Sequence, residues 1–275
     1  EVTGFALPPA TNPNLFELAD VASGMTSVLG DIRSAEALSK AMLEAEPEIV
    51  IHMAAQPLVR ASYEDPIETF STNVMGTVHL LEAARHTRSV KAILNVTTDK
   101  CYENKEWHWS YREIDPLGGH DPYSNSKACS EFVTASYRAS FFNPARYAEH
   151  GVAVATARAG NVIGGGDWSQ DRLIPDLVRA GGRGESVEIR SPNSTRPWQH
   201  VLDCLYGYLL VAQTHMEEKG DTPNSVNFGP NESLSVINLI SLFEVAFSKK
   251  IEFDVSESHL PESEWLALDS GLARA

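Results

Sequence analysis

Short apolar runs rich in β-branched residues alternate with helix-patterned segments along the first 160 residues, and this alternation constrains the fold more than any other feature. The strand candidates are EVTGFA (1–6), TSVLGDI (26–32), PEIVIHMAA (47–55), KAILNVTT (91–98) and VAVATARAGNV (152–162). Each run is separated from the next by a segment long enough to cross over the sheet. The sequence therefore predicts an α/β fold with a doubly wound, parallel sheet.

The helix-patterned segments carry start signals of their own. Residues 34–46 have helical spacing, with Ser34 as N-cap. Residues 64–86 form a longer predicted helix, capped by Asp65 and with Pro66 at the first helical position. Residues 121–141 are the third predicted helix, and this is the one that follows the strand at 91–98.

The alternation of strand-patterned and helix-patterned segments becomes less regular after Gly164, which predicts a second structural unit. We expect a first domain over residues 1–165 and a smaller lobe over residues 166–275, interleaved with the last strands of the sheet. Such a lobe would cover the carboxyl ends of the strands, where ligands bind in this architecture. A strand, Gly-rich turn and helix usually open a dinucleotide-binding fold. Because no such unit precedes EVTGFA, we expect that an N-terminal βα unit is missing and that Glu1 starts the second strand.

Charge and cysteine usage exclude several classes of partner. The formal net charge is −15, and no basic stripe offsets it, which argues against nucleic acid. No apolar run approaches the length of a membrane span. Cys101, Cys129 and Cys204 are scattered and odd in number, which indicates reduced thiols in a cytoplasmic protein and neither a disulfide frame nor a metal site.

The segment PYSNSKACSE places Tyr123 and Lys127 four residues apart, on one face of a predicted helix. A tyrosine with a pKa of ~10 is a poor base at neutral pH. A nearby ammonium favours its phenolate, so the pair can take a proton from an alcohol. A surface tyrosine beside a solvated lysine has the same spacing. The position one loop after NVTTDK, within the βα alternation, favours the catalytic interpretation.

Eight motifs along the chain point to one family: GDIR, IVIHMAAQ, TNVMGTVHLLEA, VTTDKCY, YSNSKACSE, ARAGNVIGGGDW, RLIPDLV and RPWQHVLD. Together they make the chain resemble the extended short-chain dehydrogenase/reductases, and within them the nucleotide-sugar 4,6-dehydratases. TDK, AAQPLVR and GNVIGGGDW are most similar to the members that act on CDP-glucose. The resemblance implies a Rossmann-type NAD-binding domain over 1–165 and a nucleotide-sugar-binding lobe over 166–275. It also implies a homodimer formed through helices such as 66–86.

The resemblance implies the following chemistry. NAD accepts hydride from C4 of the hexose while Tyr123, supported by Lys127, removes the proton of the 4-hydroxyl. A base then takes the C5 proton, an acid protonates the C6 hydroxyl, and water leaves. Hydride returns to C6, which gives the 4-keto-6-deoxy sugar.

The family also implies roles for the strand end. Thr98 would hydrogen-bond the 4-oxygen, and Asp99 would be the acid, which requires a raised pKa. Lys100 occupies the position where most family dehydratases carry glutamate as the C5 base. Either Lys100 has a lowered pKa and acts as the base, or it stabilises the enolate and another group takes the proton. A capped strand end with a solvated charge pair is the alternative to all of these roles.

Cofactor contacts are implied at two further strand ends. Asp31 resembles the adenine-binding aspartate of the family, with Ile32 packing on the ring. The remaining expected cofactor residues are Ala54, Ala55, Gln56 and Thr97, together with Tyr123 and Lys127. Asp31 could simply end a strand, and the alanines could be ordinary core. The residues leave NAD and NADP open, because the second strand ends with neither an acid nor an arginine; the resemblance implies NAD.

Substrate contacts are expected in the second half of the chain. The residues are Asn161, Val162, Arg172, Arg190, Arg196, Trp198 and His200. Arg196 is the best diphosphate candidate, because a guanidinium binds phosphate in a bidentate manner. Arg190 could equally be a solvated strand residue, and His200 a packed histidine.

Three functions remain in competition. The first is dehydration of a nucleotide sugar, with CDP-glucose as the expected substrate. The second is another nucleotide-sugar dehydratase or an epimerase. Epimerases do not need the Asp99–Lys100 pair, and GDP- and dTDP-sugar dehydratases usually carry glutamate in place of Lys100. The third is an inactive sugar-nucleotide binding protein, which the intact Tyr123 and Lys127 argue against.

Overall fold

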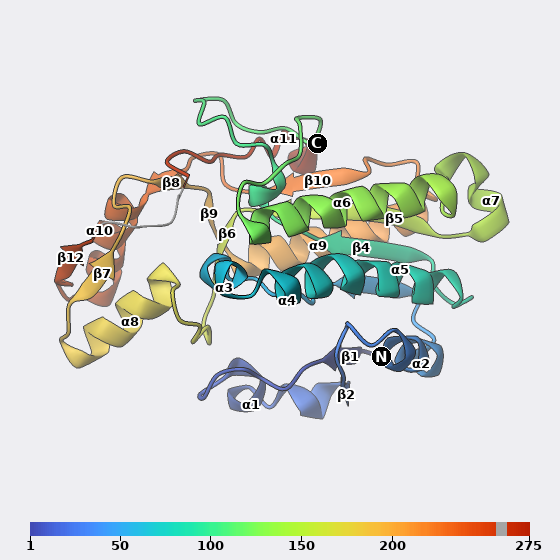
Figure 1. The fold of residues 1–275 in the computed structure, drawn as a ribbon, viewed down its shortest axis with the longest axis horizontal. Helices are drawn as coiled ribbons and strands as arrows, with labels where there is room; N and C mark the ends of the chain where they lie inside the picture. The colour runs from blue at the N-terminus through green and yellow to red at the C-terminus, as the bar shows by residue number, and fades with distance from the viewer. Residues whose placement is uncertain (257–262) are drawn as a thin grey trace.

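A four-stranded parallel sheet lies at the centre of the protein, as seen in a computed structural model that describes residues 1–256 and 263–275 (Figure 1). Its strand order is β10-β5-β4-β3. The strands are β3 (Ile49–His52), β4 (Ala92–Val96), β5 (Ala153–Ala159) and β10 (Ser225–Phe228). All three ladders are parallel, which confirms the α/β fold with crossover helices.

The N-terminal strands form a second, two-stranded parallel sheet. β1 (Thr3–Ala6) pairs with β2 (Thr26–Leu29), and α1 (Leu15–Leu18) and η1 (Val21–Gly24) connect them. Within residues 1–256 and 263–275, no ladder joins this pair to β3. Both segments were expected to be strands, which is confirmed; the expected missing βα unit stays a prediction.

The helices that follow β2 and β3 lie on one face of the sheet. α2 is Ala35–Ala45, and its predicted N-cap Ser34 accepts a hydrogen bond from the Ala37 amide. The predicted helix at 64–86 is a continuous run of α4 (Pro66–Phe70), the π-helical turn η2 (Ser71–Met75) and α5 (Gly76–Arg85). Asp65 caps it, as expected, by accepting from the Glu68 amide. α3 (Val59–Glu64) precedes it, and α6 (Pro122–Ser140) lies beside it.

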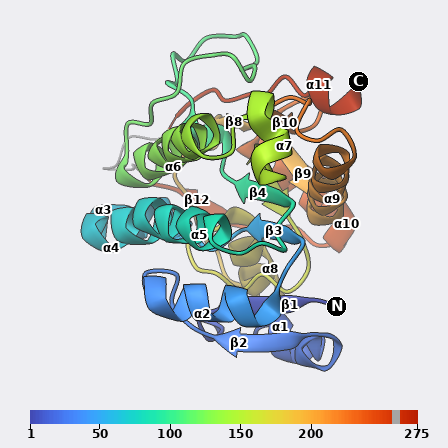
Figure 2. The same ribbon diagram turned by 90° about the vertical axis from the view of Figure 1, so that its right-hand side faces the viewer.

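The sheet is covered on both faces, and its side chains alternate accordingly. Figure 2 shows α5 and α6 on one side and α9 (Val201–Glu217) on the other. Ile93 and Val154 pack in the cluster formed with α5 and α6. Their neighbours Leu94 and Ala155 pack in the cluster formed with α9. This period of two is what a strand buried on both faces requires.

The second half of the chain builds a smaller lobe from short, non-local strand pairs. Its elements are α8 (Leu173–Arg183), α10 (Val236–Phe247), β6 (Asn161–Ile163) paired with β9 (Trp198–His200), β7 (Val187–Ile189) with β12 (Phe253–Val255), and β8 (Thr195–Arg196) with β11 (Leu234–Ser235). The lobe has its own apolar cluster around Leu177 and Ile240. β10 returns to the main sheet, so the second half interleaves with the first; the division at residue 165 stays a prediction.

Four short helical segments complete the described residues: η3 (Asp99–Cys101), η4 (Pro144–Arg146), α7 (Tyr147–His150) and α11 (Gly271–Arg274). Within the described part of the chain, no helix combines the length and apolarity that crossing a membrane requires. η3 matters most for the site, because only two residues separate it from the end of β4 and it contains Asp99 and Lys100.

Candidate active site

A cavity of about 870 Å³ opens at the carboxyl ends of β4 and β5. The ends of these strands, the first turns of α6, and elements of the smaller lobe line it. Parallel sheets bind ligands at this edge because the strand ends and the following loops converge there. The cavity is therefore the place to look for the expected catalytic residues.

The segment after β4 presents the expected acid to this cavity. Thr98 caps η3 and accepts a hydrogen bond from the Lys100 amide. Its hydroxyl also donates to Asp99 Oδ1 at 2.9 Å. Asp99 is 2% exposed, and its Oδ2 has no hydrogen-bond partner among the described residues. Burial raises the pKa of Asp99, against the opposing charges of Lys100 and Arg196. The carboxyl group is thus suited to donate a proton.

Tyr123 and Lys127 reach the same cavity from the first turns of α6. The helix starts where the Asp121 side chain accepts from the Ser124 amide and Pro122 occupies the first turn. The Lys127 ammonium donates to the Val96 carbonyl at 3.1 Å. Burial lowers the pKa of Lys127 to about 8, and the Glu131 carboxylate opposes this.

Burial also dominates at Tyr123, where it raises the pKa to about 12, with a side-chain hydrogen bond to Thr98 opposing it. Burial disfavours the phenolate as it disfavours any unpaired charge. The expected lowering of the Tyr123 pKa by neighbouring cations therefore stays a prediction. Lys100 lines the cavity as well, and both of its expected roles remain open.

The expected cofactor residues fall into two groups. Ala55 and Thr97 line the cavity. Gln56 is not among the residues that line the cavity; its backbone N–H donates to Asn73 Oδ1 at 2.8 Å. Asn73 Nδ2 in turn donates to Ser126 Oγ on α6 at 2.8 Å, so Asn73 links the segment after β3 to α6.

Three of the expected cofactor residues, Asp31, Ile32 and Ala54, do not line the cavity. The Asp31 carboxylate accepts hydrogen bonds from the Arg33 guanidinium, which lowers the pKa of Asp31. Ile32 is 6% exposed and packs in the core cluster, against which Ala54 also packs. Contact of Asp31, Ile32 and Ala54 with a cofactor stays a prediction.

Most of the expected substrate residues converge on the cavity. Those that line it are Asn161, Val162, Arg172, Arg190, Arg196 and Trp198. Arg196 is 7% exposed and donates to the carbonyls of Thr195 and Ser263. Arg172 pairs with Asp167 at 3.1 Å. His200 is not part of this lining; it caps α9 by accepting from the Leu202 amide at 3.2 Å.

Two residues at the site were not predicted from the sequence. Arg60 lines the cavity and pairs with Asp171 at 2.9 Å, and Arg190 lies 3.6 Å from the same carboxylate. Ser62 anchors the catalytic helix, because its hydroxyl accepts from the Tyr123 amide at 3.1 Å. The Arg60 signal was present in the motif AAQPLVR, but its partner is 111 residues away.

The residues present fit the nicotinamide side of an NAD cofactor. An ammonium carries three N–H donors, and the bond to Val96 uses one of the three on Lys127. The phenol of Tyr123 lies on the same helix face and lines the same cavity. An ammonium and a phenol together match the hydroxyls of a ribose. Ala55, with its small side chain, also lines the cavity.

Comparison with known proteins places this geometry in context. A family model described as the NAD dependent epimerase/dehydratase family matches residues 5–229. CDP-glucose 4,6-dehydratase of Salmonella typhimurium is 51% identical over 278 residues, which cover 99% of this chain and 77% of that protein. dTDP-glucose 4,6-dehydratase of Streptomyces antibioticus is 34% identical over 189 residues, covering 68% of this chain and 52% of that protein.

Solved structures share the fold at lower identity. A dTDP-glucose 4,6-dehydratase double mutant from Streptomyces venezuelae, with NAD and DAU bound, superposes with a TM-score of 0.83 at 24% identity, covering 100% of this chain and 80% of that one. UDP-glucuronic acid 4-epimerase from Bacillus cereus, in complex with UDP-glucuronic acid and NAD, gives 0.82 at 21% identity, covering 98% and 82%. These likenesses establish the shared fold.

Proposed function

Because the chain belongs to the NAD dependent epimerase/dehydratase family, we propose that it is a hydro-lyase that converts CDP-D-glucose to CDP-4-dehydro-6-deoxy-D-glucose with NAD. The relative that is 51% identical over 99% of the chain supports the substrate. The observation that carries the reaction type is the buried Asp99, which lines the same cavity as Tyr123 and Lys127 and whose Oδ2 has no hydrogen-bond partner among the described residues. An epimerase has no need of such an acid.

Each residue has a part that follows from its environment. NAD, when bound, supplies a reversible hydride acceptor. Tyr123 acts as the phenolate, which the Lys127 ammonium stabilises; it takes the proton of the 4-hydroxyl and becomes a phenol. Thr98 orients both the substrate oxygen and Asp99. Asp99 gives its proton to the C6 hydroxyl, which leaves as water after the C5 proton has been removed.

Two alternative mechanisms for removal of the C5 proton differ in the role of Lys100. It follows Asp99 directly, and its charge lowers the pKa of Asp99. As a neutral amine it would take the C5 proton; as an ammonium it would stabilise the enolate formed when another base takes that proton. Lys100→Met removes both functions, whereas Lys100→Glu restores a base and removes the cation.

Arginines on the cavity side of the smaller lobe would hold the CDP diphosphate. Arg190 lies beside Asp171, and Arg172 beside Asp167. Arg196 adds a buried charge nearer to Asp99. A guanidinium binds phosphate oxygens in a planar, bidentate geometry. In this arrangement residues 1–165 hold the cofactor and the reacting groups, and residues 166–275 mainly hold the nucleotide sugar.

We further propose that the enzyme is a homodimer that works in the cytoplasm. Ile67 on α4 and Phe132 on α6 are 82% and 57% exposed, and these helices share one face of the sheet in Figure 1. A matching copy would cover them. All three cysteines are free thiols, in keeping with a reducing compartment. Light scattering should give twice the chain mass, and Ile67→Glu should give a monomer; a wild-type monomer would contradict the dimer.

The reaction is tested by incubating the purified protein and NAD with CDP-, dTDP-, GDP- and UDP-hexoses and following product mass. Loss of one water from CDP-glucose alone is the expected result. Loss of water from another nucleotide hexose would identify that sugar, and not CDP-glucose, as the substrate. Isomerisation without a change of mass would favour an epimerase. No product, despite measurable NAD binding, would favour a sugar-nucleotide binding protein.

A further inference from the structure

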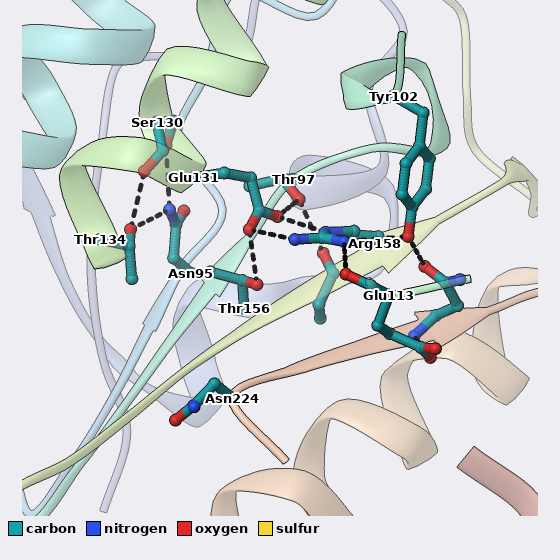
Figure 3. Close-up of polar contacts among 12 residues, drawn as sticks. Asn95, Thr97, Tyr102, Glu113, Ser130, Glu131, Thr134, Thr156, Arg158 and Asn224 are labelled. Atoms are coloured by element: carbon teal, nitrogen blue, oxygen red, sulfur yellow. Dashed lines mark hydrogen bonds and ion pairs between the residues drawn. The ribbon is translucent and has the colours of Figure 1, made fainter. Parts of the chain in front are cut away.

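A buried ion pair lies outside the residues that line the cavity. Glu131 on α6 and Arg158 on β5 are both 4% exposed. Arg158 Nε donates to Glu131 Oε1 at 3.0 Å, and Arg158 Nη2 donates to Oε2 at 2.9 Å. Figure 3 shows the two planar groups facing each other. No step of the proposed reaction uses either charge.

The pair ties β5 to the two segments that carry the catalytic groups, the end of β4 and α6. Thr97, after β4, donates to Glu131 Oε1 at 2.5 Å, and Thr156 on β5 donates to Oε2 at 2.8 Å (Figure 3). Each carboxylate oxygen therefore accepts two hydrogen bonds. The remaining guanidinium nitrogen of Arg158 donates to the Tyr102 hydroxyl at 2.9 Å and to the Glu113 carbonyl at 3.0 Å.

The residues around this pair in the sequence are the ones that the reaction needs. Thr97 directly precedes Thr98 and Asp99. Glu131 lies one helical turn after Lys127. A buried ion pair is weak evidence for stability, because apolar residues of similar volume often stabilise a core as well or better. Retaining two buried charges at this junction calls for a different benefit.

We propose that Glu131 and Arg158 are positioning residues, which hold the Thr98–Asp99 turn and the Lys127 ammonium in fixed register at the end of the sheet. The inference rests on the proposed dehydration, which needs Asp99 and Lys127 to act on one sugar. Thr97 transmits the constraint along β4, and the helical turn between Glu131 and Lys127 transmits it along α6. A shift of one ångström in such a register costs about 100-fold in rate.

Glu131 also acts on Lys127 through its charge. The titratable groups that influence the Lys127 ammonium are Glu131 on its own helix and Cys101 from η3, and Lys127 in turn influences His52 on β3. Arg158 contacts Glu131 from β5. Burial lowers the pKa of Lys127, and Glu131 raises it. Removing the Glu131 charge should therefore bring the alkaline loss of the Lys127 proton to lower pH.

The test compares Glu131→Gln with the doubly apolar Glu131→Met/Arg158→Met. Glu131→Gln leaves Arg158 without its counter-ion and is expected to lower thermal stability. The double variant removes both charges and should recover that stability. We expect kcat on CDP-glucose to fall about 100-fold in both variants, with KM little changed. If the stability-restored double variant also recovers wild-type kcat, the pair is only structural and the proposal is wrong.

Thr134→Val is the matched control. Thr134 lies on the same helix and is fully buried, and its hydroxyl donates to the Ser130 carbonyl and accepts from Asn95, with no bond to Glu131. It should lose stability without losing kcat, whereas Thr97→Val should lose kcat. If Thr134→Val lost as much kcat as Glu131→Gln, the effect would not be specific to the Glu131–Arg158 pair, and the proposal would be wrong.

A second readout does not depend on catalysis. The pKa of Lys127 is measured from the pH dependence of unfolding, as the difference between each background and the same background with Lys127→Met. We expect a lower pKa in Glu131→Gln than in the wild type; an unchanged pKa would contradict the inference. If the wild type dehydrates no sugar, the proposed function fails, while this measurement still decides whether Glu131 acts on Lys127.

Discussion

Replacing Lys127 with methionine should make the protein more stable while it abolishes activity. Burial lowers the pKa of this lysine from 10.5 to about 8. A difference of 2.5 between the two pKa values corresponds to about 3.4 kcal/mol at 1.36 kcal/mol per pKa unit. At pH 7 the lysine is protonated in both the folded and the unfolded state. The full amount is therefore the cost of keeping an ammonium in the core.

Methionine removes that charge and keeps much of the side-chain volume. The variant loses the hydrogen bond from Lys127 to the Val96 carbonyl, which is worth about 1 kcal/mol. The expected net gain at pH 7 is about 2 kcal/mol, or a rise in Tm of roughly 4–8 °C for a chain of this size. Lysine 127 is thus kept at the expense of stability, as a catalytic residue would be.

The sign of the pH dependence provides the sharper check. Between pH 8 and pH 10.5 the unfolded chain holds the Lys127 proton and the folded chain does not. The wild type should therefore gain stability relative to Lys127→Met as pH rises through this window. Comparing the two proteins cancels the titration of other groups, such as the buried tyrosines.

Urea unfolding at pH 7 and at pH 10 measures the free energy of unfolding of each protein. Lys40→Met is the control, because the Lys40 side chain is 76% exposed, and its substitution should shift neither value. The reasoning is refuted if Lys127→Met is less stable than the wild type at pH 7. It is equally refuted if the difference between the two proteins is the same at both pH values.

Three further perturbations test the site and the core. Tyr123→Phe removes the proton acceptor and should lower kcat by about 10²–10⁴, measured by initial rates; a change in KM alone would contradict its role. Asp99→Asn cannot donate the proton to the C6 hydroxyl and should stop release of water in a mass-spectrometric assay, while CDP still binds by calorimetry; residual dehydration at the wild-type rate would exclude Asp99 as the acid. Leu81 is fully buried, so Leu81→Ala should lower the free energy of urea unfolding by about 2–5 kcal/mol and leave kcat unchanged. A smaller loss would mean that the core rearranges to fill the space left by the leucine side chain.

Local signals in the sequence were sufficient for the main elements. Ser34 and Asp65 cap the helices that they were expected to cap, because the first backbone N–H groups of a helix have no partner within it and a side-chain oxygen just before the helix can accept from them. Tyr123 and Lys127 lie on one helix face because their spacing requires it. The π-helical turn at residues 71–75 was not predicted, since the sequence carries no separate signal for an i→i+5 bond.

Contacts between distant segments could not be read from the sequence. The Glu131–Arg158 pair joins a helix to a strand 27 residues later, and its partners Thr97 and Tyr102 come from before that helix. The short strand pairs of the smaller lobe have two or three residues each, too few for a periodicity. Such features depend on how the elements pack against one another. The pattern of residues within one element carries no information about that packing.

The division of the sheets has a consequence for amide hydrogen exchange. Among the strands of the described residues, β1 and β2 bond only to each other, while β4 has a strand on each side. The β1–β2 amides should exchange through local opening, well before the molecule unfolds, and the β4 amides only through global opening. Because the β4 amides exchange only through global opening, the stability gain expected for Lys127→Met should slow exchange in β4 and leave the β1–β2 pair as it was.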